Sequence, residues 1–173
     1  MKLYFLLAIF IANHAFSAGS ERVVFAEDKL SVIVPDGWKK SERNTDTTLI
    51  GWESPDETTS VFFQKTGYDR SLGMEDILDE IIEEFEVSES IKVKHAANYK
   101  SGQVNGVGKK FPAIFSTLDV TLIANPKDFE MEFYLFVFDT GDVQYFIQAS
   151  STKPVRDIRK KQIMSLIRSL VAR

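Results

Sequence analysis

The stretch FEMEFYLFVFD, Phe129 to Asp139, decides which fold class this chain can adopt. In an extended strand, successive side chains point to opposite faces of the sheet. One face of the stretch is apolar throughout and carries Phe129, Met131, Phe133, Leu135 and Val137. The other face begins with acids and ends with aromatic residues, in the order Glu130, Glu132, Tyr134, Phe136 and Phe138. A strand whose second half is apolar on both sides belongs to a sheet that is covered on both faces.

Apolar segments before and after this stretch predict further strands. The residues Asp139-Thr140-Gly141-Asp142 are a hairpin signal that joins strands predicted at 130–138 and 143–150. Earlier segments that are rich in β-branched and aromatic residues predict strands at 22–25, 30–34, 48–53, 60–65, 93–101 and 107–116. These segments supply the strands of the predicted sheet.

Two segments show helical periodicity. Between Gly73 and Ser88, apolar residues fall on one face, within a sector roughly 140° wide. They are Met74, Ile77, Leu78, Ile81, Ile82 and Phe85. The second helix is predicted from about Pro154 to Val171, with a proline in its first turn. The two helices are expected to cover the two faces of the sheet, which predicts an α+β domain with three layers (α/β/α).

The order of these elements resembles that of the PsbP-like proteins. The similarity rests on a strand that enters VPDGWKK (34–40), a strand pair, an acidic amphipathic helix, a glycine-containing hairpin, a long aromatic hairpin and a terminal helix ending in IMSLIRSL (163–170). The group includes the Ran-binding Mog protein of yeast and the DcrB-like proteins of bacterial envelopes. The resemblance implies an antiparallel sheet between helices, and a role as an accessory subunit, a GTPase-binding factor or an envelope protein. DcrB-like proteins are usually anchored by a lipid on a cysteine, which this chain lacks.

The first residues, MKLYFLLAIFIANHAFSA, have the composition of a secretory signal peptide. One cation, Lys2, precedes an apolar run at residues 3–12, and small residues follow. A membrane-spanning helix needs roughly 20 residues, about twice this run, so no membrane anchor is expected. Residues 1–18 are therefore predicted to be a signal peptide, and residues 19–173 to be a single exported domain, periplasmic or secreted.

The predicted mature domain is acidic and has no cysteine. The chain holds 21 Lys and Arg against 25 Asp and Glu, and loss of Lys2 with the signal changes the net charge from −4 to 20 − 25 = −5. An acidic surface does not attract nucleic acid, so we expect no nucleic-acid partner. Without cysteines the domain must be stabilised by packing rather than by disulfides.

The stretch GQVNGVGKKFP, Gly102 to Pro112, has the composition of a phosphate-binding loop but not its spacing. A Walker-type loop with Gly108 as its second glycine needs another glycine at the position of Gln103 and a hydroxyl residue at the position of Lys110. The residues that follow are typical of a strand, whereas the loop requires a helix. We therefore predict a hairpin turn, with positive φ at Asn105-Gly106, and no cofactor.

Catalytic and metal-binding patterns are scarce. His95 is the single histidine of the predicted mature domain, and no cysteine is present to share a zinc ion with it. We expect no catalytic residue, no cofactor-binding residue and no metal ligand. The alternative is that His95 acts as a general base. Trp38, in Pro35-Asp36-Gly37-Trp38, is interpreted as a core residue that follows a turn. The alternative interpretation is that its ring is a surface on which a ligand stacks.

The start of the last predicted helix has cations in line with its apolar stripe. The cations Arg156, Arg159 and Lys160 project into the same sector as the apolar residues Ile163, Ile167 and Leu170. Cations cannot be buried without partners. Either the first turn extends past the sheet, with its cations in water or paired to acids such as those of the first helix, or the cations form a contact surface. Arg156, Arg159 and Lys160 are the candidate partner-binding residues.

These features predict a non-enzymatic binding or accessory protein outside the cytoplasm. Its partner is expected to be a protein of the envelope. The sequence also allows contact with a membrane surface. The alternative is a hydrolase or ligand-modifying enzyme that uses carboxylates or His95. A deep pocket with convergent polar groups would favour the enzyme, and a filled core with an exposed patch would favour the binding protein.

Overall fold

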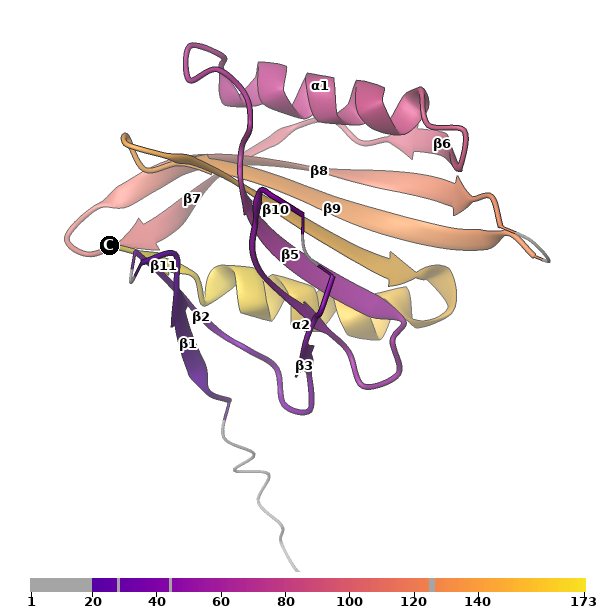
Figure 1. Ribbon diagram of the computed structural model, residues 1–173, viewed down its shortest axis with the longest axis horizontal. Coiled ribbons are helices and arrows are strands. Elements are labelled where there is room, and N and C mark those ends of the chain that lie inside the picture. The colour runs from indigo at the N-terminus through magenta and orange to yellow at the C-terminus, as the bar shows by residue number, and fades with distance from the viewer. Residues whose placement is uncertain (1–19, 28, 44, 125–126) are drawn as a thin grey trace, which may run out of the picture.

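The computed structural model describes residues 20–27, 29–43, 45–124 and 127–173. The predicted signal peptide, residues 1–18, lies outside the described residues. The described chain forms an 11-stranded sheet with two α-helices (Figure 1). Neither of these helices combines the length and the apolar character that crossing a membrane would require.

The sheet is mixed, and its strand order differs from the chain order. Its strands are β1 (Arg22–Phe25), β2 (Leu30–Ile33), β3 (Lys39–Lys40), β4 (Thr48–Glu53), β5 (Thr59–Lys65), β6 (Ile91–Ala96), β7 (Lys100–Gly106), β8 (Lys110–Leu122), β9 (Phe129–Asp139), β10 (Gln144–Thr152) and β11 (Val171–Ala172). They lie in the order β1-β2-β11-β7-β8-β9-β10-β5-β4-β3, and β6 pairs with β8 beside β7. The β11–β7 pair is parallel, and the other pairs among the described strands are antiparallel.

Strand β9 is the stretch FEMEFYLFVFD, and the predicted burial of its second half on both faces is confirmed. Residues Tyr134 to Phe138 are at most 8% exposed. Phe138 lies opposite Ala113 of β8 and Tyr145 of β10, and its ring stacks on the Tyr145 ring at a centroid distance of 5.0 Å. β9 is therefore a central strand of the sheet.

The two helices pack on different cores. Helix α1 (Met74–Glu86) packs over β6, β8 and β9, and its start is capped because the Asp76 carboxylate accepts a hydrogen bond from the Gly73 N–H at 3.0 Å. A 3₁₀ turn, η1 (Lys153–Val155), leads into α2 (Arg156–Arg168). At the end of α2, the Ser169 hydroxyl accepts a hydrogen bond from the Ile33 N–H at 2.7 Å, which ties the helix end to β2.

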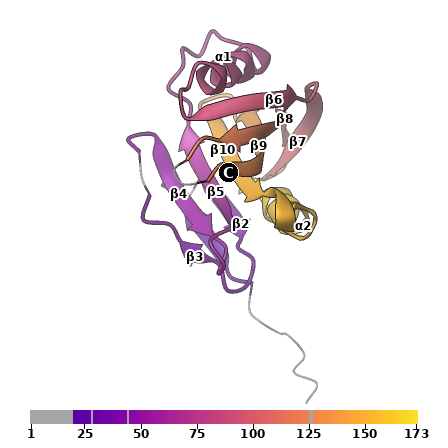
Figure 2. The same ribbon diagram turned by 90° about the vertical axis from the view of Figure 1, so that its right-hand side faces the viewer.

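The core around α2 is enclosed mainly by strands. It combines α2 with residues of β1, β2, β4, β5 and β7 to β10, including a triangle of edge-to-face rings formed by Phe25, Trp52 and Phe63. The other core, below α1, joins that helix to β8, β9 and β10. Figure 2 shows the sheet bending from β8 and β9 through β10 and β5 to β4, so that it curls around the first of these cores.

The predicted three-layer α/β/α arrangement, with an antiparallel sheet covered by helices on both faces, is wrong. The sheet is a curled, mixed half-barrel, and the described chain has only two short helices, α1 and α2. The apolar pattern of β9 correctly required a cover on both faces. It could not say whether helices or strands supply that cover, and on the concave face the strands β1, β2 and β4 supply much of it.

Three element predictions also need correction. The strand predicted at 93–101 is two strands, β6 and β7, which pair with different halves of β8. β8 extends to Leu122, beyond its predicted end at Ser116, because the residues that follow pair with both β9 and β6. The polar residue Ser116 is buried within the strand and donates a hydrogen bond to the Ala97 carbonyl at 2.7 Å. Val171, expected at the end of the last helix, lies in β11.

The glycine-rich stretch forms the predicted hairpin turn, between β7 and β8. Its left-handed residue is Gly108, with φ of 74°, and not the predicted Asn105-Gly106 pair. The expectation that Trp38 belongs to the core is confirmed, because its side chain is 9% exposed and packs in the core around α2.

Candidate functional site

The three predicted partner-binding residues lie on the first turns of α2 and differ in their surroundings. The Arg159 side chain is only 15% exposed and forms an ion pair with Asp56 of the β4–β5 turn. Its Nη1 also donates a hydrogen bond to Gln162 Oε1 at 2.7 Å. Hydrogen bonds from Ser54, then Arg159 and Thr58, hold the pKa of Asp56 well below its usual range. Arg159 therefore links α2 to the β4–β5 turn.

Lys160 and Arg156 remain at the surface. Lys160 Nζ lies 3.8 Å from Glu132 Oε1 and 5.6 Å from the centre of the Tyr134 ring. The Tyr134 hydroxyl donates a hydrogen bond to Glu132, and burial, followed by the Glu132 carboxylate, raises the pKa of Tyr134. Arg156 is exposed, with Nε 3.6 Å from the carboxylate of its neighbour Asp157. The acids that pair with Arg159 and Lys160 come from the β4–β5 turn and β9 rather than from α1.

A groove runs along α2, between the helix and the strands β7 to β9. One part of it has a volume of 400 Å³ and an apolar floor to which Phe115, Phe136, Met164 and Ile167 contribute. The rings of Phe115 and Phe136 stack with centroids 6.3 Å apart. Phe115 and Met164 are half-buried, so the floor is reachable from solvent. We call this surface the α2 groove.

The rim of the α2 groove is basic. An adjoining hollow of 450 Å³ is lined by Asp157, Lys160, Lys161, Met164 and Arg168. Lys100 of β7 lies on the far side, with Nζ 5.8 Å from the centre of the Phe115 ring. Within the described ranges, Lys100, Lys161 and Arg168 form no ion pair. Cations therefore line both sides of an apolar floor.

The partner-binding residues predicted from the sequence lie at only one end of this surface. Lys160, Met164 and Arg168 follow one another at a spacing of four residues and so lie on one side of α2, next to the buried stripe. That spacing was readable from the sequence. The positions of Phe115 and Lys100 under the same helix depend on the fold.

The alternative acid–base residues are not gathered in the described structure. His95 is exposed on β6 and lies opposite Asp119 of β8. Hydrogen bonds from Lys94 and Thr121, helped by Lys153, lower the pKa of the neighbouring Glu130 to about 2. A general acid at neutral pH needs a raised carboxyl pKa, which is the opposite shift. The described residues also contain no group of three or more His, Cys, Asp or Glu side chains arranged to hold a metal ion.

Comparison with known proteins relates this chain to others through its fold. No protein-family model and no curated protein matches the sequence. Cyanobacterial PsbP (CyanoP) from Synechocystis sp. PCC 6803 superposes with a TM-score of 0.61 at 10% identity, over 88% of this chain and 92% of that chain. LpqN of Mycobacterium tuberculosis, described as involved in cell envelope biogenesis, gives a TM-score of 0.56 at 12% identity, over 87% of this chain and 88% of LpqN.

The Ran-binding protein Mog1p of Saccharomyces cerevisiae is a third structural neighbour. It gives a TM-score of 0.54 at 9% identity, over 87% of this chain and 93% of Mog1p. The predicted resemblance to the PsbP-like group is therefore confirmed at the level of structure, and the chain has the PsbP/Mog-type fold. At these identities the similarity establishes the fold alone.

Proposed function

We propose that this chain is a non-catalytic binding or accessory protein, and that it holds an acidic protein partner in the α2 groove. The observation that carries this proposal is the position of the half-buried Phe115 floor between Lys100 on β7 and the cations of α2. A reachable apolar floor supplies binding area. A rim on which cations outnumber acids, here Lys160, Lys161 and Arg168 against Asp157, steers an acidic partner and raises its association rate.

The contact residues differ partly from those read from the sequence. Lys160 stays in the proposed contact surface, and Lys161 and Arg168 join it because all three line the same rim. Arg156 stays in it as an exposed cation one turn before Lys160. Arg159 is assigned a structural role through Asp56, since its side chain is largely buried and already paired.

Two structural neighbours have names that are compatible with this proposal. Mog1p is named a Ran-binding protein, and LpqN is described as involved in cell envelope biogenesis. The name of Mog1p supports a binding role, and the description of LpqN supports a role in the cell envelope. The nature of the partner is inferred only from the groove of this chain.

A location outside the cytoplasm is the second part of the proposal, and it rests on the signal-like composition of residues 1–18. The exported protein is expected to begin between Ala18 and Ser20, because the small residues Ala15, Ser17 and Ala18 suit cleavage of a signal peptide there. Amino-terminal sequencing of the protein from the exported fraction checks this expectation. A chain that retains Met1 would contradict it.

Crosslinked capture from the exported fraction tests the groove. The wild type is compared with the double variant Lys161→Glu/Arg168→Glu and with the control Lys39→Glu/Lys40→Glu, which reverses two exposed charges on β3. The groove variant is expected to lose the captured acidic protein, and the control is expected to keep it. Capture by the wild type should also weaken as salt is added.

Two results would count against the groove as a protein site. Equal capture by the wild type and the groove variant at low salt would contradict the proposal. Binding to vesicles of anionic lipid that the groove variant alone loses, without a captured protein, would assign the surface to a membrane instead.

A further inference from the structure

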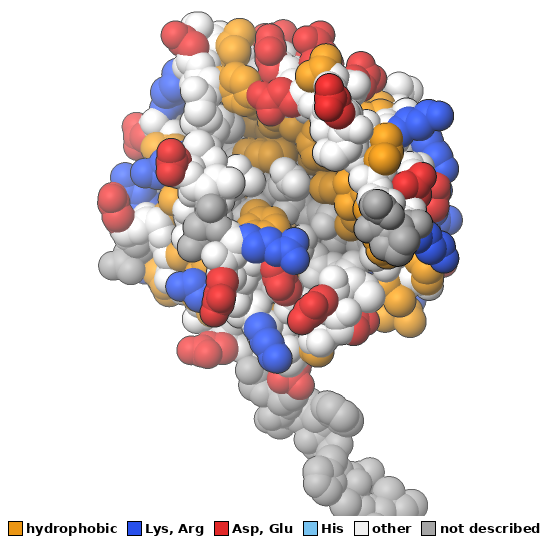
Figure 3. Space-filling view, turned by 45° about the vertical axis from the view of Figure 1, so that its right-hand side comes forward, with side chains coloured by type: hydrophobic (Ala, Val, Ile, Leu, Met, Phe, Trp, Pro, Cys, Tyr) orange, Lys and Arg blue, Asp and Glu red, His pale blue; other side chains and the backbone are white. Residues whose placement is uncertain are grey.

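A cleft lies below α1, on the convex side of the sheet and away from the α2 groove. It has a volume of 390 Å³ and is lined by parts of α1, β5, β10 and the segments that precede β4 and follow β5. On this side of the molecule the sheet bends away from α1 as it passes from β10 to β4 (Figure 2). Figure 3 shows the hollow with its hydrophobic floor below the acidic side chains of α1.

The floor of the cleft is apolar and fixed by the core. Ile81, Phe85 and Phe146 line it, and each is at most 9% exposed because it also packs in the core below α1. Half-buried Phe62 continues the same face of the sheet, with its ring over Gly51. Apolar atoms of a ligand would therefore meet a rigid surface.

Amide side chains alternate with the aromatic residues on this floor. In the β5–β10 register, Gln64 lies opposite Phe146, and Gln148 lies opposite Phe62. Amide and aromatic side chains therefore alternate along each strand and across the pair. The Thr47 hydroxyl donates a hydrogen bond to Gln64 Oε1 at 3.1 Å, and among the described residues no acceptor takes the Gln64 amide hydrogens, which can therefore meet a ligand. Side-chain amides offer both donors and acceptors, as a peptide backbone requires.

The wall of the cleft is acidic. Glu84 lines it, and the Tyr68 hydroxyl donates a hydrogen bond to Glu84 Oε1 at 2.9 Å. Burial, then the hydrogen bond to Glu84 and the charges of Glu84 and Glu80, raise the pKa of Tyr68 to about 12. Both glutamates are exposed, and α1 contains no basic residue. Lys65 is the cation among the lining residues.

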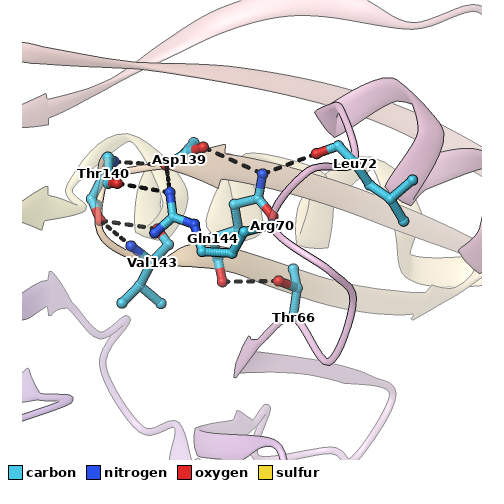
Figure 4. A network of polar contacts seen from close by, with 8 residues as sticks. Thr66, Arg70, Leu72, Asp139, Thr140, Val143 and Gln144 are labelled. Atoms are coloured by element: carbon cyan, nitrogen blue, oxygen red, sulfur yellow. Dashed lines mark hydrogen bonds and ion pairs between the residues drawn. The ribbon is translucent and has the colours of Figure 1, made fainter.

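Hydrogen bonds fix the segment that carries Tyr68. At its beginning, the Thr66 N–H donates to the Gln144 carbonyl at 3.0 Å. Beyond Tyr68, Arg70 donates to the Gly141 carbonyl at 2.7 Å and pairs with Asp139, as Figure 4 shows for the Asp139 pair. The segment is thus held on both sides of Tyr68 by the β9–β10 hairpin, so the wall of the cleft is preformed.

We propose that the cleft below α1 binds a segment of a partner protein that places an apolar side chain on the floor and a lysine or arginine beside Glu80 and Glu84. The floor fits the apolar group, the amides of Gln64 and Gln148 fit the backbone beside it, and the acidic wall selects the cation. This site is independent of the proposed function, because it lies on a different face and selects the opposite charge.

A selection from a random peptide library displayed on phage tests this proposal. The library is selected against the immobilised full chain, and enriched sequences are measured as synthetic peptides by fluorescence anisotropy. Enriched peptides are expected to carry an apolar residue next to a lysine or arginine. The double variant Glu80→Lys/Glu84→Lys should weaken their binding by at least about tenfold, and Gln148→Arg should do so without changing α1.

The controls separate this site from the rest of the molecule. Glu83→Lys makes the same charge change on the solvent side of α1 and should alter the affinity by less than about twofold. Lys161→Glu/Arg168→Glu, which tests the α2 groove, should leave peptide binding unchanged. The melting temperature of each variant is measured alongside.

Three results would overturn the proposal. They are the absence of any enriched peptide, enrichment of peptides without a basic residue, and an equal loss of binding in Glu83→Lys and Glu80→Lys/Glu84→Lys. The first two reject the chemistry of the ligand, and the third rejects the position of the site.

Discussion

Arg159 of α2 forms an ion pair with Asp56 of the β4–β5 turn, a residue 103 positions earlier in the sequence. The pair connects the last helix to the far side of the curled sheet. Replacing Arg159 with alanine is expected to lower the free energy of unfolding by about 1–2 kcal/mol, because the ion pair and the packing of the side-chain stem are both lost. Denaturant unfolding checks this, with Arg168→Ala, an exposed cation without an ion pair in the described chain, as the matched control.

The Asp56 carboxylate is also expected to make the stability of the protein depend on pH. The folded-state pKa of Asp56 is depressed below its ordinary value of about 3.9, so its stabilising effect is complete above that value and is lost as the pH falls through the folded-state pKa. The stability difference between the wild type and Asp56→Asn should therefore be constant above about pH 5 and shrink below about pH 4. A difference that does not change across this range in denaturant unfolding would show that the Asp56 charge is not involved.

Trp38 is expected to stabilise the fold through its size rather than through its indole N–H. The side chain is 9% exposed, and its Nε1 atom is buried without a hydrogen-bond partner in the described structure. Trp38→Ala should lower the free energy of unfolding by about 3–5 kcal/mol. Trp38→Phe should cost clearly less, because it removes the unsatisfied donor and keeps an aromatic ring. Equal losses for the two variants would mean that the N–H has a partner.

Position 51 is expected to need glycine, because the ring of Phe62 occupies the space that a Cβ atom would fill. A Cβ atom at position 51 would lie 2.4 Å from Phe62 Cδ1, so alanine forces the ring to move. Overpacking of this kind costs about 1–3 kcal/mol. Thermal unfolding of Gly51→Ala in the wild-type and Phe62→Ala backgrounds checks the cause, since the penalty should largely disappear when the ring is absent. A penalty of equal size in both backgrounds would point to the backbone.

Gly108 is expected to be the sensitive glycine of the β7–β8 turn. Its φ of 74° lies in the left-handed region, while the space around a Cβ atom there is open. Gly108→Ala should therefore lower stability by about 1–2 kcal/mol through backbone strain alone, and Gly108→Asn should cost less. Asn105→Ala, at the position first predicted to have positive φ, is the control and should have a smaller effect in the same unfolding measurement.

Most of the helices, strands and turns could be predicted from the sequence. The pattern in Phe129–Asp139 predicted a strand whose second half is buried on both faces, the spacing from Met74 to Phe85 predicted α1, and Asp139–Asp142 predicted a hairpin. Each of these features depends on neighbours within a few residues, whose periodicity is fixed by the geometry of a strand or a helix. The predictions failed where polar residues are buried by distant partners, as Ser116 is within β8.

The sequence by itself determined which segments are apolar and which charges each helix carries, because helix and strand geometry place those residues on defined faces. It also supported the PsbP-like resemblance that the fold confirms. Only the tertiary structure decided what covers each face, that Arg159 meets Asp56, and that Phe115 lies beneath the cations of α2. These relationships arise from pairing between strands far apart in the chain and from the curl of the sheet, so no local pattern of residues encodes them.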